Sequence, residues 1–187
     1  MYVIKRDGRK ESVKFDKITA RVNKLCYGLD PIVDSTSVAM KVIEGLYEGV
    51  TTEKLDNLAS EVSAAMSTKH PDYGTLASRI IVSNHHKNTS PSFSETMEIL
   101  YQNKDTLGNH TPLINEEFYK IVKQHKNKLN TIIKYERDYN VDYFGFMTLY
   151  RSYLIRVNGK PVERPQDMYL RVALGIHRND FKEAIYT

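Results

Sequence analysis

Apolar residues three and four positions apart predict four helices in the first 90 residues of the chain. The first helix carries Ile18 and Val22 on its apolar side, Asp16 stands where an N-cap is expected, and Gly28 is expected to stop it. The predicted helices cover about residues 16–28, 35–48, 52–66 and 71–87. Helices of this length with one apolar face pack against each other in a shared core.

Two short strand-like stretches, residues 2–5 and 10–15, precede these helices. Asp7-Gly8 lies between them and is typical of a type I′ turn, because glycine adopts a positive φ without steric cost. We therefore expect residues 1–90 to form one domain in which a β-hairpin caps four helices.

The pattern changes at residues 88–92, whose sequence NTSPS favours a domain boundary. Helices are predicted over residues 92–101, from Asn115 to about Ile133, and after Pro165, and another begins near the last residues. Asn158-Gly159 predicts a small hairpin. The fold is thus expected to be mainly α, with residues 91–187 as a second, mostly helical domain.

Composition excludes several classes of protein. The chain has 187 residues, 41% of them hydrophobic and 27% charged, which is ordinary for a globular protein. No apolar run approaches the roughly 20 residues of a membrane helix, and the first residues do not resemble a signal peptide. Cys26 is the one cysteine, so an internal disulfide and a zinc ribbon are excluded and a reducing compartment is favoured.

Part of the net charge of +4 comes from the lysines between residues 120 and 134. We interpret them as the solvated face of a helix. The alternative, a patch for nucleic acid or an acidic partner, lacks an accompanying aromatic or zinc-finger signature.

Basic and hydroxyl residues near predicted helix starts form a candidate phosphate site. Lys5, Arg6, Arg9 and Lys10 give the hairpin positive charge. Lys17 and the pair Thr51-Thr52 stand at helix starts, where backbone N–H groups and the helix dipole favour anions. An apolar slot for a base could be formed by Val3, Val13, Ile18 and Leu55. Glycine-rich P-loop and Rossmann motifs are absent from the sequence.

Several motifs resemble the ATP-cone at the start of the eukaryotic-type large subunit of class I ribonucleotide reductase. They are VIKRDGR at residues 3–9, FDKI at 15–18, KLCYGL at 24–29, GVTTEKLD at 49–56, TKHPDY at 68–73 and SNHHK at 83–87. The resemblance continues with YERD at 135–138, YFGF at 143–146, RSYL at 151–154, ERPQDM at 163–168 and VALGIH at 172–177. These resemble the helical region that leads into the catalytic barrel of that family.

The resemblance implies an allosteric site for ATP as activator and dATP as inhibitor, with Mg²⁺ accompanying the nucleotide. Carried over by position, the nucleotide-binding residues are Lys5, Arg6, Glu11, Ser12, Val13, Lys14, Phe15, Asp16, Lys17, Thr52, Asp56 and Lys87. The lysines, the arginine and Thr52 are expected near the phosphates, and residues 11–16 around the adenine. Asp56 lies one helical turn after Thr52, which places it near the sugar.

Other interpretations of these residues remain open at this point. Asp16 could serve only as an N-cap, Lys17 could be a solvated lysine, and Asp56 could pair with a neighbour on its own helix. His85 and His86 are expected at the surface rather than on a metal.

The resemblance also implies partners and a location. We expect other large subunits, assembling in response to ATP or dATP, and the small radical-generating subunit as partners in the cytoplasm, and neither nucleic acid nor a membrane. The radical chemistry of the family needs several cysteines, so no catalytic residue, catalytic cofactor or metal site is assigned here. Two alternatives are a cone-bearing transcriptional repressor, which would carry a zinc ribbon, and a freestanding nucleotide-binding module.

Overall fold

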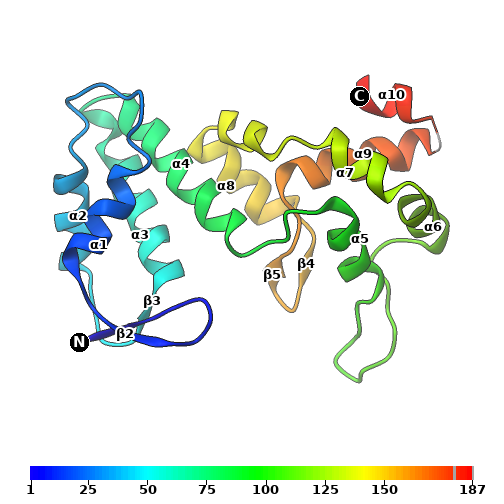
Figure 1. The fold of residues 1–187 in the computed structure, drawn as a ribbon, viewed down its shortest axis with the longest axis horizontal. Coiled ribbons are helices and arrows are strands. Elements are labelled where there is room, and N and C mark those ends of the chain that lie inside the picture. Colours follow the sequence, from blue (N-terminus) through cyan, green and yellow to red (C-terminus); the bar gives the residue numbers. More distant parts are fainter. Residues whose placement is uncertain (179, 187) are drawn as a thin grey trace. The chain divides into compact units, whose positions relative to one another are not determined.

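The computed structural model describes residues 1–178 and 180–186 and divides into two compact units (Figure 1). The first unit comprises residues 1–85 and 141–146, and the second comprises residues 86–140 and 147–187. Helices dominate both units, with short strands at the N-terminus and one small hairpin later in the chain. The predicted mainly α fold is therefore confirmed. No helix within the described residues is both long enough and apolar enough to cross a membrane.

The first unit opens with a three-stranded sheet of order β2-β1-β3. The strands are β1 (Tyr2–Ile4), β2 (Lys10–Ser12) and β3 (Val50–Thr51). β1 pairs antiparallel with β2 and parallel with β3, in the register Val3 to Val50. The sequence did not predict β3, because two residues are too few to show an alternating pattern. This third strand joins the hairpin directly to the start of α3 (Thr52–Ala65).

The turn between β1 and β2 differs from the predicted type I′ geometry. It has three loop residues, closed by hydrogen bonds from Lys5 N to Arg9 O (2.9 Å) and from Gly8 N to Lys5 O (3.0 Å). Gly8 has a φ of 84°, but Asp7 does not have a positive φ. A type I′ turn requires both central residues in that region, whereas this loop places only Gly8 there, as a glycine bulge does.

The four predicted helices of the first unit are present. They are α1 (Phe15–Asn23), α2 (Ser35–Glu44), α3, and α4 (Asp72–His86), with a short 3₁₀ turn η1 (Met66–Thr68) after α3. Lys14, not Asp16, occupies the N-cap of α1, so the predicted cap is wrong and Asp16 lies in the first turn. α1 also ends five residues before Gly28, which instead forms a separate turn with a φ of 66°.

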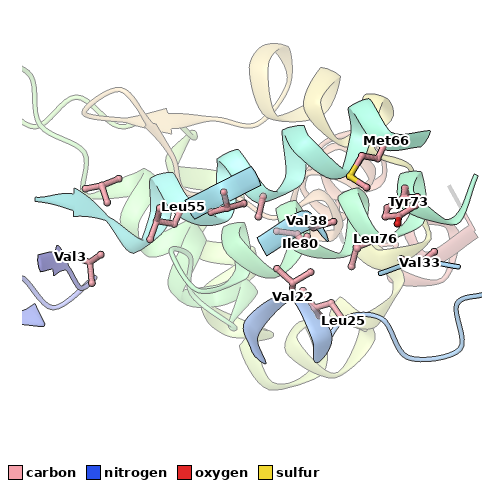
Figure 2. Packing of buried hydrophobic residues seen from close by; sticks show 13 residues of the cluster. Val3, Val22, Leu25, Val33, Val38, Leu55, Met66, Tyr73, Leu76 and Ile80 are labelled. Atoms are coloured by element: carbon pink, nitrogen blue, oxygen red, sulfur yellow. The ribbon is translucent and has the colours of Figure 1, made fainter. Parts of the chain in front are cut away.

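The core of the first unit collects the apolar faces of all four helices and of β1 (Figure 2). Val22 comes from α1, Val38 from α2, Leu55 from α3, Leu76 from α4 and Val3 from β1. In Figure 2 Val3 and Leu55 lie toward the sheet end of this core, and Met66 and Tyr73 lie toward the opposite end. Burial of these side chains is the main favourable contribution to folding of the unit.

The second unit is a helical layer with one hairpin. Its elements are α5 (Phe93–Tyr101), α6 (Glu116–Gln124), α7 (Lys126–Ile132), the 3₁₀ segment η2 (Tyr135–Asn140), β4 (Arg156–Val157), β5 (Lys160–Pro161), α9 (Pro165–His177) and α10 (Phe181–Tyr186). α8 (Tyr143–Ser152) begins in the first unit and ends in the second. The predicted hairpin is confirmed, with positive φ at both Asn158 and Gly159. The helix predicted after Asn115 is instead two helices, interrupted at His125.

Candidate nucleotide site

Asp56 is the centre of the polar cluster in the first unit. Its carboxylate accepts hydrogen bonds from Arg21 Nε to Oδ1 (3.1 Å) and from Arg6 Nη2 to Oδ2 (3.1 Å). Arg21 Nη2 also approaches Oδ2, at 3.4 Å. Asp56 is 6% exposed, and a carboxylate that is buried to this extent is stabilised by cationic partners such as these two arginines. Its partners come from the hairpin loop and from α1, which excludes the interpretation that Asp56 only pairs within its own helix.

Two residues of α4 extend the cluster. Arg21 Nη2 donates to Ser83 Oγ (2.9 Å), and Arg6 donates to Asn84 Oδ1. The Asn84 amide in turn donates to Asn57 Oδ1 (2.7 Å). The cluster thus joins the hairpin loop, α1, α3 and α4 at one point.

Four residues of the cluster were not predicted from the sequence: Arg21, Asn57, Ser83 and Asn84. Ser83 and Asn84 lie in the SNHHK motif, which was an available signal. Arg21 is one helical turn after Lys17 on α1, and this spacing was its only local indication.

Glu11 is the second carboxylate of the site and holds two lysines. Lys5 Nζ lies 3.4 Å from Glu11 Oε2, and Lys17 Nζ donates to Oε1. The hydrogen bond from Lys17 is the main cause that lowers the pKa of Glu11 below its ordinary value. Together with the Asp56 cluster, four cationic side chains meet two carboxylates, which leaves a net charge of +2 on these six groups.

The start of α3 supplies backbone donors. Thr51 is the N-cap, and its Oγ1 accepts a hydrogen bond from Lys54 N (3.2 Å). Thr52 is the first residue of the helix, at the positive end of its dipole. A helix start of this kind stabilises a phosphate.

Most of the segment predicted to surround the base is accessible. Ser12, Lys14, Phe15 and Asp16 are exposed, and Val13 is half-buried. Lys87 is exposed and directly follows α4. It belongs to the second unit, so its role in the site remains a prediction from the sequence.

The four residues of the predicted apolar slot differ in burial, and their contact with a base stays a prediction. Val3 and Leu55 are 7% and 9% exposed and form part of the hydrophobic core. Val13 and Ile18 pack against that core and remain partly exposed. The strand and helix that carry Val3 and Leu55 turn these side chains inward, a direction that the linear pattern alone does not fix.

The prediction that both histidines after Asn84 lie on the surface is wrong for His85, while the side chain of His86 is 14% exposed. His85 is 4% exposed and meets the edge of Phe146, with ring centroids 5.5 Å apart. His86 Nε2 lies 2.7 Å from Asp138 Oδ2. In the part of the chain that the structure describes, no three His, Cys, Asp or Glu side chains gather as metal ligands.

Comparison with known proteins identifies both parts of the chain. Residues 1–88 match the family described as "ATP cone domain", and residues 139–187 match "Ribonucleotide reductase, all-alpha domain". The resemblance seen in the sequence motifs is therefore confirmed: residues 1–88 are similar to an ATP-cone and residues 139–187 are similar to this all-alpha domain.

Whole-chain relatives agree with this assignment. The chain is 54% identical to "Ribonucleoside-diphosphate reductase large chain 2" of Saccharomyces cerevisiae, covering 100% of this chain and 22% of the relative. It is 55% and 54% identical to the "Ribonucleoside-diphosphate reductase large subunit" of Danio rerio and of Vaccinia virus, covering 100% of this chain and 24% of each relative. The chain thus spans about a quarter of the length of these proteins.

Proposed function

Because the chain combines an ATP-cone with the ribonucleotide reductase all-alpha domain, we propose that it is the allosteric region of a ribonucleoside-diphosphate reductase large subunit. Its cone binds ATP as activator and dATP as inhibitor. Residues 1–90 form the nucleotide-binding domain, and residues 91–187 form the helical domain that leads into the catalytic barrel. The enzyme that contains it reduces ribonucleotides to deoxyribonucleotides for DNA synthesis in the cytoplasm.

The excess of positive charge around Glu11 and Asp56 carries this proposal. A nucleoside triphosphate brings several negative charges, which a net charge of +2 beside a helix start attracts. Lys5, Arg6 and Lys17 donate to the phosphates, with Thr52 at the helix start and Lys87 beside them. Mg²⁺ accompanies the triphosphate and is held by its oxygens.

Residues 11–16, at the end of β2 and the start of α1, bind the adenine. The exposed residues Ser12, Lys14 and Phe15 leave the backbone of this segment accessible to the polar edge of the base. The ring of Phe15 is 53% exposed and offers an aromatic face for the purine. Asp56 lies one turn from Thr52 on α3, where it meets the sugar.

The partners of the enzyme follow from the same family. Other large subunits associate through the exposed cone surface when dATP binds, and the small radical-generating subunit joins the assembly. The lysines of residues 120–134 are not needed for this association. No catalytic residue of the enzyme is assigned to this chain.

Isothermal titration of the 187-residue chain with ATP, dATP and GTP tests nucleotide binding directly. Lys5→Ala and Lys87→Ala each remove a charge-assisted hydrogen bond, which lowers affinity for both adenine nucleotides by about tenfold to a hundredfold. Lys120→Ala is the matched control, since Lys120 is an exposed lysine paired with Glu116 on α6. If the Lys5 and Lys87 variants bind as tightly as the original chain, the phosphates bind elsewhere. A chain that binds neither adenine nucleotide contradicts the proposal as a whole.

A further inference from the structure

We propose that Arg21 is a positioning residue that sets the discrimination between ATP and dATP by fixing the carboxylate of Asp56. Arg6, the other arginine on Asp56, leaves this carboxylate when a triphosphate binds. The inference rests on the proposed nucleotide site. Arg21 is not among the nucleotide-binding residues predicted from the sequence. The two arginines have different roles, since Arg21 orients Asp56 and Arg6 binds phosphate.

Arg21 is held from several directions. Its Nε and Nη2 meet both oxygens of Asp56, and its Nη2 also donates to Ser83 Oγ at 2.9 Å. The two-point contact between a guanidinium and a carboxylate fixes the orientation of both groups. Arg21 lies on α1, Asp56 on α3 and Ser83 on α4, and its side chain is 24% exposed. All three residues thus stand on helices whose apolar faces share one core.

Arg6 is placed differently. It lies in the three-residue loop between β1 and β2, and its Nη2 donates to Oδ2 of Asp56 and to Asn84. It follows Lys5 directly in the chain, so a phosphate bound by Lys5 comes within reach of its guanidinium. A phosphate then competes with Asp56 for this arginine. Because Arg6 is on a loop, it can exchange partners without moving a helix.

Departure of Arg6 changes what Asp56 offers. Oδ2 then loses the donor at 3.1 Å, while Arg21 still holds the carboxylate. An ionised carboxylate only accepts hydrogen bonds, so on a sugar it can accept one only from a hydroxyl group. ATP and dATP differ by one such hydroxyl. The ratio of their dissociation constants therefore depends on the orientation that Arg21 gives to Asp56.

The test measures dissociation constants of ATP and dATP for Arg21→Lys and Arg6→Lys by isothermal titration. Arg21→Lys keeps the charge and loses the two-point contact. We expect it to move the ATP/dATP ratio toward 1 by about threefold or more, the worth of one hydrogen bond. Arg6→Lys should weaken both nucleotides by the same factor, which leaves the ratio unchanged. Arg178→Lys is the control, since Arg178 is an exposed arginine paired with Glu117 in the second unit.

Thermal unfolding of each variant shows whether it is folded. If Arg21→Lys does not fold, Ser83→Ala removes only the outer hydrogen bond of Arg21 and should shift the ratio in the same direction by a smaller factor. A folded Arg21 variant with the original ratio overturns the inference, and so does an original chain that binds ATP and dATP equally. An original chain that binds neither nucleotide overturns the proposed function as well, which separates the two failures.

Discussion

The guanidinium of Arg164, at the start of α9, donates a hydrogen bond of 2.9 Å to the backbone carbonyl of His86, the last residue of α4. The same side chain donates to the carbonyl and the hydroxyl of Thr89, at 3.0 and 2.9 Å. Arg164 is 5% exposed, so these bonds are shielded from water. The residues that follow α4 are thus bound to the second unit through their backbone.

Arg164→Ala should destabilise the second unit strongly. It leaves buried acceptors at His86 and Thr89 without their charged donor, a loss of about 3–5 kcal/mol in the free energy of unfolding. Urea unfolding followed by circular dichroism measures it. Arg178→Ala, which removes an exposed arginine, should change the free energy by less than about 1 kcal/mol. Equal effects of the two substitutions would show that the Arg164 bonds contribute little.

Asp167 makes the stability of the second unit depend on pH. Burial raises the pKa of this carboxyl from 3.8 to about 6, against the opposing hydrogen bonds from Arg164 N and the Tyr135 hydroxyl. At a pH between 3.8 and about 6, Asp167 is protonated in the folded chain, whereas in the unfolded chain it has released its proton. The contribution of Asp167 to stability is therefore full below about pH 4 and declines as the pH rises to about 6.

Asp167→Asn removes this titration. The free energy of unfolding of the original chain, minus that of the variant, should fall between pH 4 and pH 6 by an amount on the order of 2 kcal/mol, at about 1.4 kcal/mol per pKa unit. Urea unfolding at four pH values in this range gives the difference directly. A difference that is constant with pH, or that rises, contradicts the raised pKa.

Glu11→Gln should strengthen the binding of a triphosphate. The substitution releases Lys5 and Lys17 from the carboxylate that now holds them, so both can turn to the phosphates. We expect a gain of about threefold to tenfold for inorganic triphosphate, less at high salt. A smaller gain for ATP than for inorganic triphosphate would indicate that Glu11 also contacts the base. Glu117→Gln, at an exposed glutamate of α6, is the control. Weaker binding of inorganic triphosphate would count against the competition.

Gly8→Ala and Gly175→Ala should shift stability in opposite directions, although neither new Cβ meets another atom within 4 Å. Gly8 has a φ of 84°, so alanine there costs about 1–2 kcal/mol. Gly175 lies within α9, where alanine stabilises the helix by about 0.5–1 kcal/mol. Urea unfolding of the two variants beside the original chain measures both. Two changes of the same sign would show that backbone conformation does not decide them.

Local patterns predicted the elements whose causes are local. The Asn158-Gly159 turn and the cap at Asn115 were correct, because the residues that form them are neighbours in the chain. The helical spacing of Thr52 and Asp56 is local as well. Arg21 and Asp56 are 35 residues apart in the sequence, and no periodicity in the sequence predicts their contact.

Side-chain directions could not be predicted, because they depend on contacts between residues that are distant in the sequence. Asp16 has a side chain suited to an N-cap, yet the N-cap of α1 is Lys14, two residues earlier. Packing turns Val3 and Leu55 into the core, and their predicted contact with a base stays a prediction. In each case the sequence identified the segment correctly, and tertiary packing decided the direction of the side chain.

The central position of β1 in its sheet has a consequence for synthesis of the protein. Val3 leaves the ribosome 47 residues before its parallel partner Val50. At about 5–20 residues per second, this delay is about 2–9 seconds. During that time the β1–β2 hairpin exists without its third strand, and a hairpin alone is only marginally stable in water. The polar cluster around Asp56 therefore cannot form on the nascent chain until α3 and α4 have been made, because its side chains come from the hairpin loop, α1, α3 and α4.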